Sequence, residues 1–277
     1  MLLRMRTLAQ SGILRRVAAA LRRFRDDDLG AMSAALTFQA FLSLFPLMLL
    51  ALSIAGFALA GDPAEWLQRF FAAVPGIGPM LDRNLEPIVR ARGGLGALAL
   101  AGVVWTSSGL TDRASDALER IFRIRDPNTL RRRARSLVTM LILGAALLAA
   151  LVISGTVAAI HVEGWAGTPV RIPGLVAVAV VEFGFFLASY RVLLPPSGPR
   201  LRAHVPGAIF MTVGWELLKL VGGLLVVYVV TRASALYGTI GGVFGILVFL
   251  RIASSMYLLG AELSAIVDEE GREPGGL

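Results

Sequence analysis

The chain has 277 residues, of which 56% are hydrophobic and only 17% charged, with a net charge of +8 and no cysteine. A soluble globular protein carries roughly a quarter charged residues, so this composition is typical of a membrane protein. Without cysteine, disulfides and thiolate metal sites are excluded, and two histidines are too few for a histidine-rich site. We therefore expect no metal and no cofactor.

Six apolar segments are long enough to cross the roughly 30 Å of hydrocarbon in a bilayer. They cover residues 32–60, 94–110, 137–160, 173–194, 204–230 and 239–267. The sequence therefore predicts an all-α fold, a polytopic membrane bundle of six transmembrane helices. This division leaves a basic N-terminal segment at 1–31, a membrane domain at 32–267 and a short tail at 268–277.

The arginines fall mainly on one side of these spans. Residues 2–25 hold seven arginines and no acid, and the linker 111–136 holds eight arginines against four acids. By the positive-inside rule the N-terminus is cytoplasmic, and six crossings return the C-terminus to the same side. Topology thus explains the positive charge better than nucleic-acid binding does, and we expect no nucleic-acid partner.

Three amphipathic helices accompany the spans. The first 25 residues predict a basic helix on the cytoplasmic lipid surface, because apolar residues recur at helical spacing opposite the arginines: Ile13, Leu14, Val17, Leu21 and Phe24. A second helix is predicted near 62–75, and a third over 110–122 continues the second span. A basic cluster then follows, which either contacts anionic lipid headgroups or only fixes topology: Arg131, Arg132, Arg133 and Arg135.

Four ionisable residues lie inside the predicted spans, namely Glu182, Glu216, Arg251 and the chain's only lysine, Lys219. A rise of about 1.5 Å per residue places all four near one depth in the bilayer. Two acids and two bases form a set of zero net charge, which a low-dielectric site tolerates. The set is either a midplane polar site for a substrate or proton, or a clamp between helices that binds nothing.

The first span carries a polar face. Gln39, Ser43 and Pro46 share one side of the helix with Leu50 and Ser53, because successive spacings are four and three residues. Pro46 removes a backbone donor, so a kink is expected there unless neighbours absorb it. A polar, kinked face is typical of a transport pathway and equally of helix packing.

Phosphate-binding loops, zinc-protease motifs and nucleophile elbows are absent from the sequence.

Several stretches resemble the YihY/BrkB family of bacterial inner-membrane proteins. They are "SAALTFQAFLSLFPLMLL", "HVPGAIFMTVGWELLKL", "LYGTIGGVFGILVFL" and "LLGAELSA", and the likeness runs from about residue 28 to 268. Matching positions include Ser43, Leu44, Pro46, Val205, Pro206, Gly207, Ala208, Glu216, Lys219, Tyr237, Gly238, Gly260, Ala261 and Glu262. Phe38 and Arg251 depart from the family pattern, so the resemblance supports Glu216 and Lys219 as a unit more than Arg251.

The resemblance implies six transmembrane helices in the bacterial plasma (inner) membrane and a link to virulence and serum resistance. It also implies a connection with export of envelope lipid precursors. We therefore expect a transporter- or flippase-like protein for an envelope solute or lipid-linked precursor, the alternative being a non-transporting scaffold or envelope-integrity factor. The old ribonuclease label of some members has no chemical basis in this sequence, and we expect no enzyme activity. Small-residue faces permit a homo-oligomer without requiring one.

Overall fold

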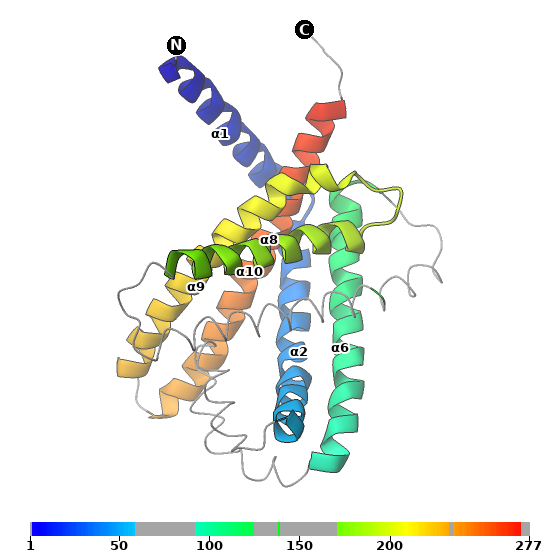
Figure 1. Ribbon diagram of the computed structural model, residues 1–277, viewed down its shortest axis with the longest axis vertical. Coiled ribbons are helices and arrows are strands. Elements are labelled where there is room, and N and C mark those ends of the chain that lie inside the picture. Colours follow the sequence, from blue (N-terminus) through cyan, green and yellow to red (C-terminus); the bar gives the residue numbers. More distant parts are fainter. Residues whose placement is uncertain (1, 59–91, 125–137, 139–170, 233–234, 273–277) are drawn as a thin grey trace. The chain divides into compact units, whose positions relative to one another are not determined.

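The computed structural model describes residues 2–58, 92–124, 138, 171–232 and 235–272 (Figure 1). Every regular element in these residues is helical: α1 (Leu2–Asp26), α2 (Leu29–Ala58), α6 (Arg92–Ile121), α8 (Arg171–Leu193), the 3-10 helix η1 (Leu201–His204), α9 (Val205–Arg232) and α10 (Ala235–Arg272). The all-α prediction is confirmed for this part of the chain. The predicted helix near 62–75, nearly all of the predicted span 137–160 and the cluster Arg131–Arg135 lie outside the described residues.

Four stretches of the described helices are long and apolar enough to cross a membrane. They are Leu29–Leu47, Val176–Leu193, Leu201–Gly222 and Gly241–Arg272, and they correspond to the predicted first, fourth, fifth and sixth spans. The predicted second span lies in α6, which continues without interruption to Ile121. Likewise α10 continues past the predicted boundary at Asp268 to Arg272.

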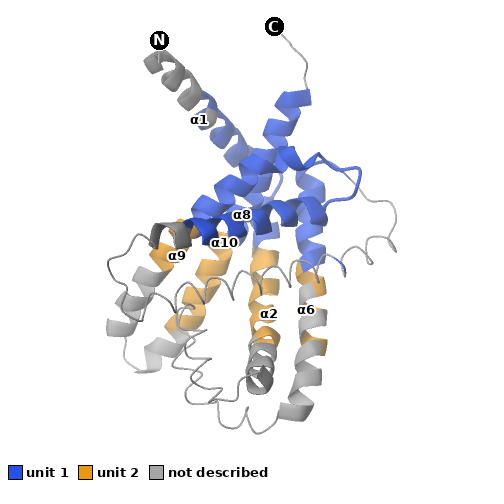
Figure 2. Cartoon of the chain, in the orientation of Figure 1, with its two compact units in different colours: residues 1–33, 111–215, 254–277 blue, residues 34–110, 216–253 orange. Residues whose placement is uncertain are grey.

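The chain forms two compact units that interleave along the sequence (Figure 2). Unit 1 comprises Met1–Ser33, Thr111–Trp215 and Ser254–Leu277, and unit 2 comprises Ala34–Leu110 and Glu216–Ala253. Each unit therefore collects parts of several helices rather than a continuous stretch of chain.

Residues with positive φ mark two helix ends in unit 1. Asp28, at φ 52°, lies in the turn between α1 and α2, and aspartate is one of the residues that tolerate this conformation. After α6, Arg123 has φ 53°, and Ile124 N–H donates to the carbonyl of Glu119 at 2.9 Å. This six-to-one hydrogen bond is the Schellman motif that satisfies the last carbonyls of a helix.

The amphipathic pattern predicted over 110–122 is present in α6. Its apolar residues at helical spacing, Ala114, Ala117, Leu118 and Ile121, are buried in unit 1. Arg113 and Arg120 lie on the exposed side of the same helix. The periodicity of the sequence therefore predicted both the helix and its packed face.

Helices α9 and α10 pack closely in unit 1 because glycines lie where they cross. A Cβ atom on Gly207 would collide with the carbonyl oxygen of Gly260 and with Ser264 Oγ. The Gly207 N–H donates to Ser264 Oγ at 3.0 Å, and that hydroxyl donates to the His204 carbonyl at 3.4 Å. Glycine allows this approach because it brings no side chain, as in other close helix crossings of membrane proteins.

Two tyrosines join α8 to α10 in the same unit. The rings of Tyr190 and Tyr257 stack with centroids 4.7 Å apart, and Tyr190 Oη donates to the Tyr257 carbonyl at 2.7 Å. Ser189 Oγ lies 3.0 Å from Tyr257 Oη. Each buried hydroxyl thus has a partner, as buried tyrosines usually do.

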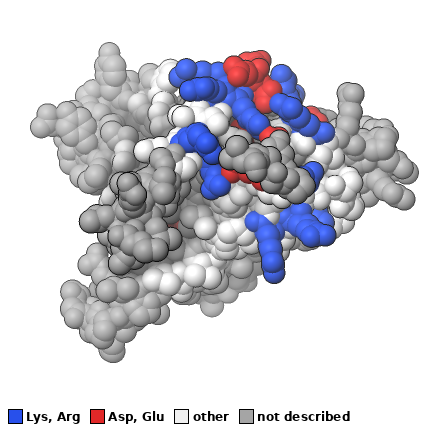
Figure 3. All heavy atoms as spheres, turned by 90° about the horizontal axis from the view of Figure 1, so that it is seen from above, with Lys and Arg blue, Asp and Glu red and all other residues white. Residues whose placement is uncertain are grey.

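Ion pairs hold α1 against the end of α10. Arg23 donates to both oxygens of Glu269, at 3.1 and 2.6 Å, and Arg16 Nη2 lies 2.7 Å from Glu270 Oε2. The hydrogen bond to Glu269 raises the pKa of the Arg23 guanidinium above its ordinary value. In Figure 3, basic and acidic side chains accordingly lie beside one another. A bidentate pair fixes orientation, although each partly exposed pair contributes at most about 1 kcal/mol.

Candidate functional site

The predicted pair of Glu216 and Lys219 is formed on α9 in unit 2. Lys219 Nζ donates to Glu216 Oε1 at 2.9 Å, one turn along the helix. Leu218, between them in sequence, is buried, whereas Leu217 and Leu220 are 57% and 63% exposed. The pair therefore lies beside an exposed apolar strip of the helix, and its side chains are themselves 38% and 37% exposed.

This position is unusual for charges in a candidate membrane span. The pair lies within Leu201–Gly222, and its apolar neighbours present the surface expected to face lipid. A charge exposed to hydrocarbon costs several kcal/mol, so intramembrane ion pairs normally face a polar space or protein. The geometry thus places the two charges at the edge of the packed face, where a polar group could reach them from the side.

The register between α9 and α10 can be compared with the one obtained by counting residues outward from the short link between the two helices. The sequence places Arg251 opposite Leu218, and in unit 2 a Cβ on Gly222 would meet the ring of Phe249 at 3.4 Å. Since the two helices are antiparallel, this contact sets Arg251 opposite residue 220, two positions from the prediction. Arg251 is half-buried on that part of α10.

The polar face predicted on α2 packs against α6 in unit 2. Gln39 Nε2 donates to the Thr106 carbonyl at 2.9 Å, and a Cβ on Gly102 would meet the Pro46 ring at 3.2 Å. Ser43 is buried and donates to the Gln39 carbonyl of its own helix at 2.8 Å. The helix continues through Pro46. These contacts show that the face packs against α6, and its role as a transport pathway stays a prediction.

The four predicted ionisable residues belong to different compact units. Glu182 lies half-buried on α8 and belongs to unit 1, whereas Glu216, Lys219 and Arg251 belong to unit 2. The four-charge set as a whole therefore stays a prediction. Among the described residues, groups of three or more His, Asp or Glu that could hold a metal ion are absent.

Glu262 is a candidate that sequence reasoning did not single out as a site. Its side chain is completely buried on α10, and neither carboxyl oxygen has a hydrogen-bond partner in the described part of the chain. Two positively charged residues, Arg23 and Arg123, and two acidic residues, Asp27 and Glu269, interact electrostatically with this carboxyl group. Buried polar groups are nearly always hydrogen-bonded, so one that is not marks a position of functional interest. Its place after Gly260 and Ala261 in the family motif was the available signal.

We expect Glu262→Leu to raise the thermal unfolding midpoint of the detergent-solubilised protein by about 3 °C or more. A buried carboxyl without hydrogen bonds lowers stability, and an apolar side chain of similar size removes that cost. Glu119→Leu is the matched control, because Glu119 is also buried in unit 1 but has interaction partners. A fall with Glu262→Leu as large as with Glu119→Leu would show that Glu262 stabilises the fold.

Long apolar helices, with an ion pair inside one of them, define an integral α-helical membrane protein. The family described as "Virulence factor BrkB" matches residues 20–276, and the chain belongs to this family, as the sequence motifs indicated. No solved structure is significantly similar to the chain.

Three relatives illustrate what the chain is similar to, and two of them are named as membrane proteins. The chain is 28% identical over 88% of its length to a UPF0761 membrane protein of Methylibium petroleiphilum, and it spans only 60% of that relative. It is 24% identical to the inner membrane protein YhjD of Escherichia coli, over 95% of this chain and 84% of YhjD. The putative ribonuclease-like protein YfkH of Bacillus subtilis is 24% identical over 87% of this chain and 91% of YfkH. The absence of enzyme activity in this chain stays a prediction from the sequence.

Proposed function

We propose that this chain is a transporter- or flippase-like protein for an envelope solute or a lipid-linked precursor. It acts as a six-span bundle in the bacterial inner membrane with both termini in the cytoplasm, as its arginine distribution favours. The observation that carries the proposal is the Glu216–Lys219 ion pair, 2.9 Å long and over one-third exposed beside lipid-facing leucines.

A pair in this position suits a passenger with a polar head and an apolar tail. The tail stays in the hydrocarbon along the exposed strip of α9, and the head exchanges its water for the charges of the pair. Lys219 is a compact cation that binds phosphate as a point charge, and Glu216 is its resting counterion. An ion pair inside a span otherwise costs free energy, which makes a polar pathway the default interpretation of such residues.

Lipid scrambling in proteoliposomes tests the proposal. The probes are nitrobenzoxadiazole-labelled phosphatidylglycerol and a labelled polyprenyl phosphate, with dithionite added outside to bleach the outer leaflet. Wild-type protein should expose the inner-leaflet label of at least one probe, whereas Glu216→Gln and Lys219→Met should slow this at least about tenfold, the effect of losing about 1.4 kcal/mol of binding in transit.

The matched control removes an ion pair elsewhere. Asp268→Asn and Arg272→Met break the i,i+4 pair of 2.8 Å on α10, which has no place in the proposed pathway, and should scramble like wild type. If wild-type vesicles match empty vesicles with both probes and show no uptake of candidate solutes, the non-transporting scaffold is the better account.

A further inference from the structure

One face of α1 points away from the rest of unit 1. Leu14 and Leu21 are 69% and 46% exposed, and Ala18 between them is exposed as well. Spacings of four and three residues put the three side chains on one stripe of the helix. Leu14 and Leu21 belong to the apolar face predicted from the sequence, and the structure leaves both exposed.

The arginines of α1 divide into two sets. Arg16 and Arg23, seven residues apart, turn inward and bind the glutamates at the end of α10. Arg15, Arg22 and Arg25 are exposed. At about 100° per residue, Arg25 falls on the leucine stripe and the other two fall along its edge. The outer face of α1, meaning Leu14, Arg15, Ala18, Leu21, Arg22 and Arg25, is thus both apolar and basic.

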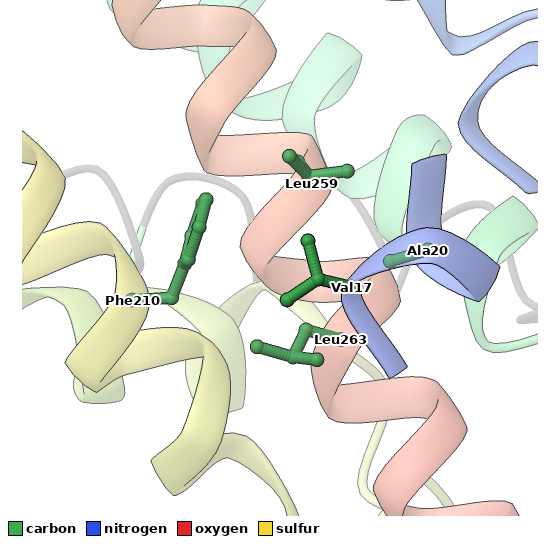
Figure 4. A pocket seen from close by; sticks show the side chains of 5 residues that line it. All are labelled: Val17, Ala20, Phe210, Leu259 and Leu263. Atoms are coloured by element: carbon green, nitrogen blue, oxygen red, sulfur yellow. The ribbon is translucent and has the colours of Figure 1, made fainter. Parts of the chain in front are cut away.

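The opposite side of α1 faces other helices of unit 1. Val17 and Ala20 border an apolar notch with Phe210 of α9 and Leu259 and Leu263 of α10 (Figure 4). Together with the two ion pairs, this contact fixes which way α1 faces. The outer face is therefore presented in a defined orientation, and the helix does not need to detach from unit 1 to use it.

We propose that the outer face of α1 docks on an anionic phospholipid surface. The helix ends only two residues before α2, whose first part is a candidate span, so its C-terminal end lies at the edge of the bilayer. Leucines on such a helix insert at the headgroup boundary and arginines pair with lipid phosphates. The exposed charges match an anionic surface, and the inference does not depend on any transport activity.

Electron paramagnetic resonance on the full-length chain tests this docking. The sequence has no cysteine, so Leu14→Cys and Leu21→Cys each carry a single spin label. The protein is placed in nanodiscs of phosphatidylcholine with or without phosphatidylglycerol. Oxygen, which partitions into lipid, and a water-soluble nickel chelate report the surroundings of the label. We expect both labels to become more accessible to oxygen and less to nickel when phosphatidylglycerol is present.

Two triple variants separate the outer face from general charge. Replacing Arg15, Arg22 and Arg25 by glutamine should lower the docking equilibrium constant on the order of 100-fold, because each arginine near an anionic surface contributes several-fold. Replacing three other exposed arginines of unit 1 by glutamine, namely Arg113, Arg120 and Arg202, changes the net charge equally and should leave the labels embedded.

Two results would overturn the proposal. Labels that remain equally open to the nickel chelate in both kinds of disc would show that the outer face stays in water. Spin–spin broadening between labels in discs that hold two copies would show that a second copy of the chain covers this face instead.

Discussion

Gly207→Ala is expected to lower the thermal unfolding midpoint of the detergent-solubilised protein by roughly 2–6 °C, an effect of about 1–3 kcal/mol. The new methyl group would collide with the Gly260 carbonyl and with Ser264 Oγ. Backbone cannot turn aside as a flexible side chain can, so α9 and α10 must separate. Separation also weakens the hydrogen bond from Gly207 N–H to Ser264.

Two other glycines serve as controls for this substitution. Gly184 on α8 has nothing within 4 Å of an added Cβ, so Gly184→Ala should be neutral or slightly stabilising through helix propensity. At Gly214 the added atom would meet the flexible end of Met256, which can move, so Gly214→Ala should cost less than Gly207→Ala. Equal midpoints for all three variants would contradict the close crossing.

Exchanging the charges of Glu216 and Lys219 should restore stability without restoring transport. Glu216→Lys alone puts two cations one turn apart in a span and should cost about 1–2 kcal/mol, less than a fully buried pair because both side chains are partly exposed. Adding Lys219→Glu re-forms an opposite-charge pair. Unfolding midpoints of the single and double variants measure this recovery.

Measuring lipid scrambling by the same variants distinguishes a pair that binds a passenger from a pair that only holds α9 in place. A passenger recognised by a cation at position 219 meets an anion there after the exchange, so scrambling should stay at least about tenfold below wild type. If the exchanged pair recovers both stability and transport, the pair acts only by holding α9 in place.

Helical periodicity and the length of the apolar segments predicted most of the described helices. The pattern of Ala114, Leu118 and Ile121 predicted the buried face of α6, because such spacing has one solution on a helix. Counting outward from the short link between α9 and α10 likewise gave their register within two residues. These features depend on residues close together in the sequence or on a short connection.

Long-range pairings could not be predicted in this way. Arg16 and Glu270 are 254 positions apart, and neither local pattern indicates a partner. The acidic end of α10 was interpreted only as a tail, although its glutamates orient α1. Similarly, the polar face of α2 did not indicate which group Gln39 would meet, and its partner, the Thr106 carbonyl on α6, is 67 positions away. Burial of Glu262 without hydrogen bonds depends on the packing of several helices.

The central expectation is that water reaches Lys219, because the Glu216–Lys219 pair lies partly exposed on α9. The chain has no cysteine, so Lys219→Cys introduces a single thiol. The measurement is its rate of reaction in proteoliposomes with the membrane-impermeant cation 2-(trimethylammonium)ethyl methanethiosulfonate. We predict that the thiol reacts, and that the attached cation restores scrambling. Gly271 is exposed, so Gly271→Cys in matched vesicles is the positive control. If its thiol reacts and the thiol of Lys219→Cys does not, a polar path to the pair is contradicted.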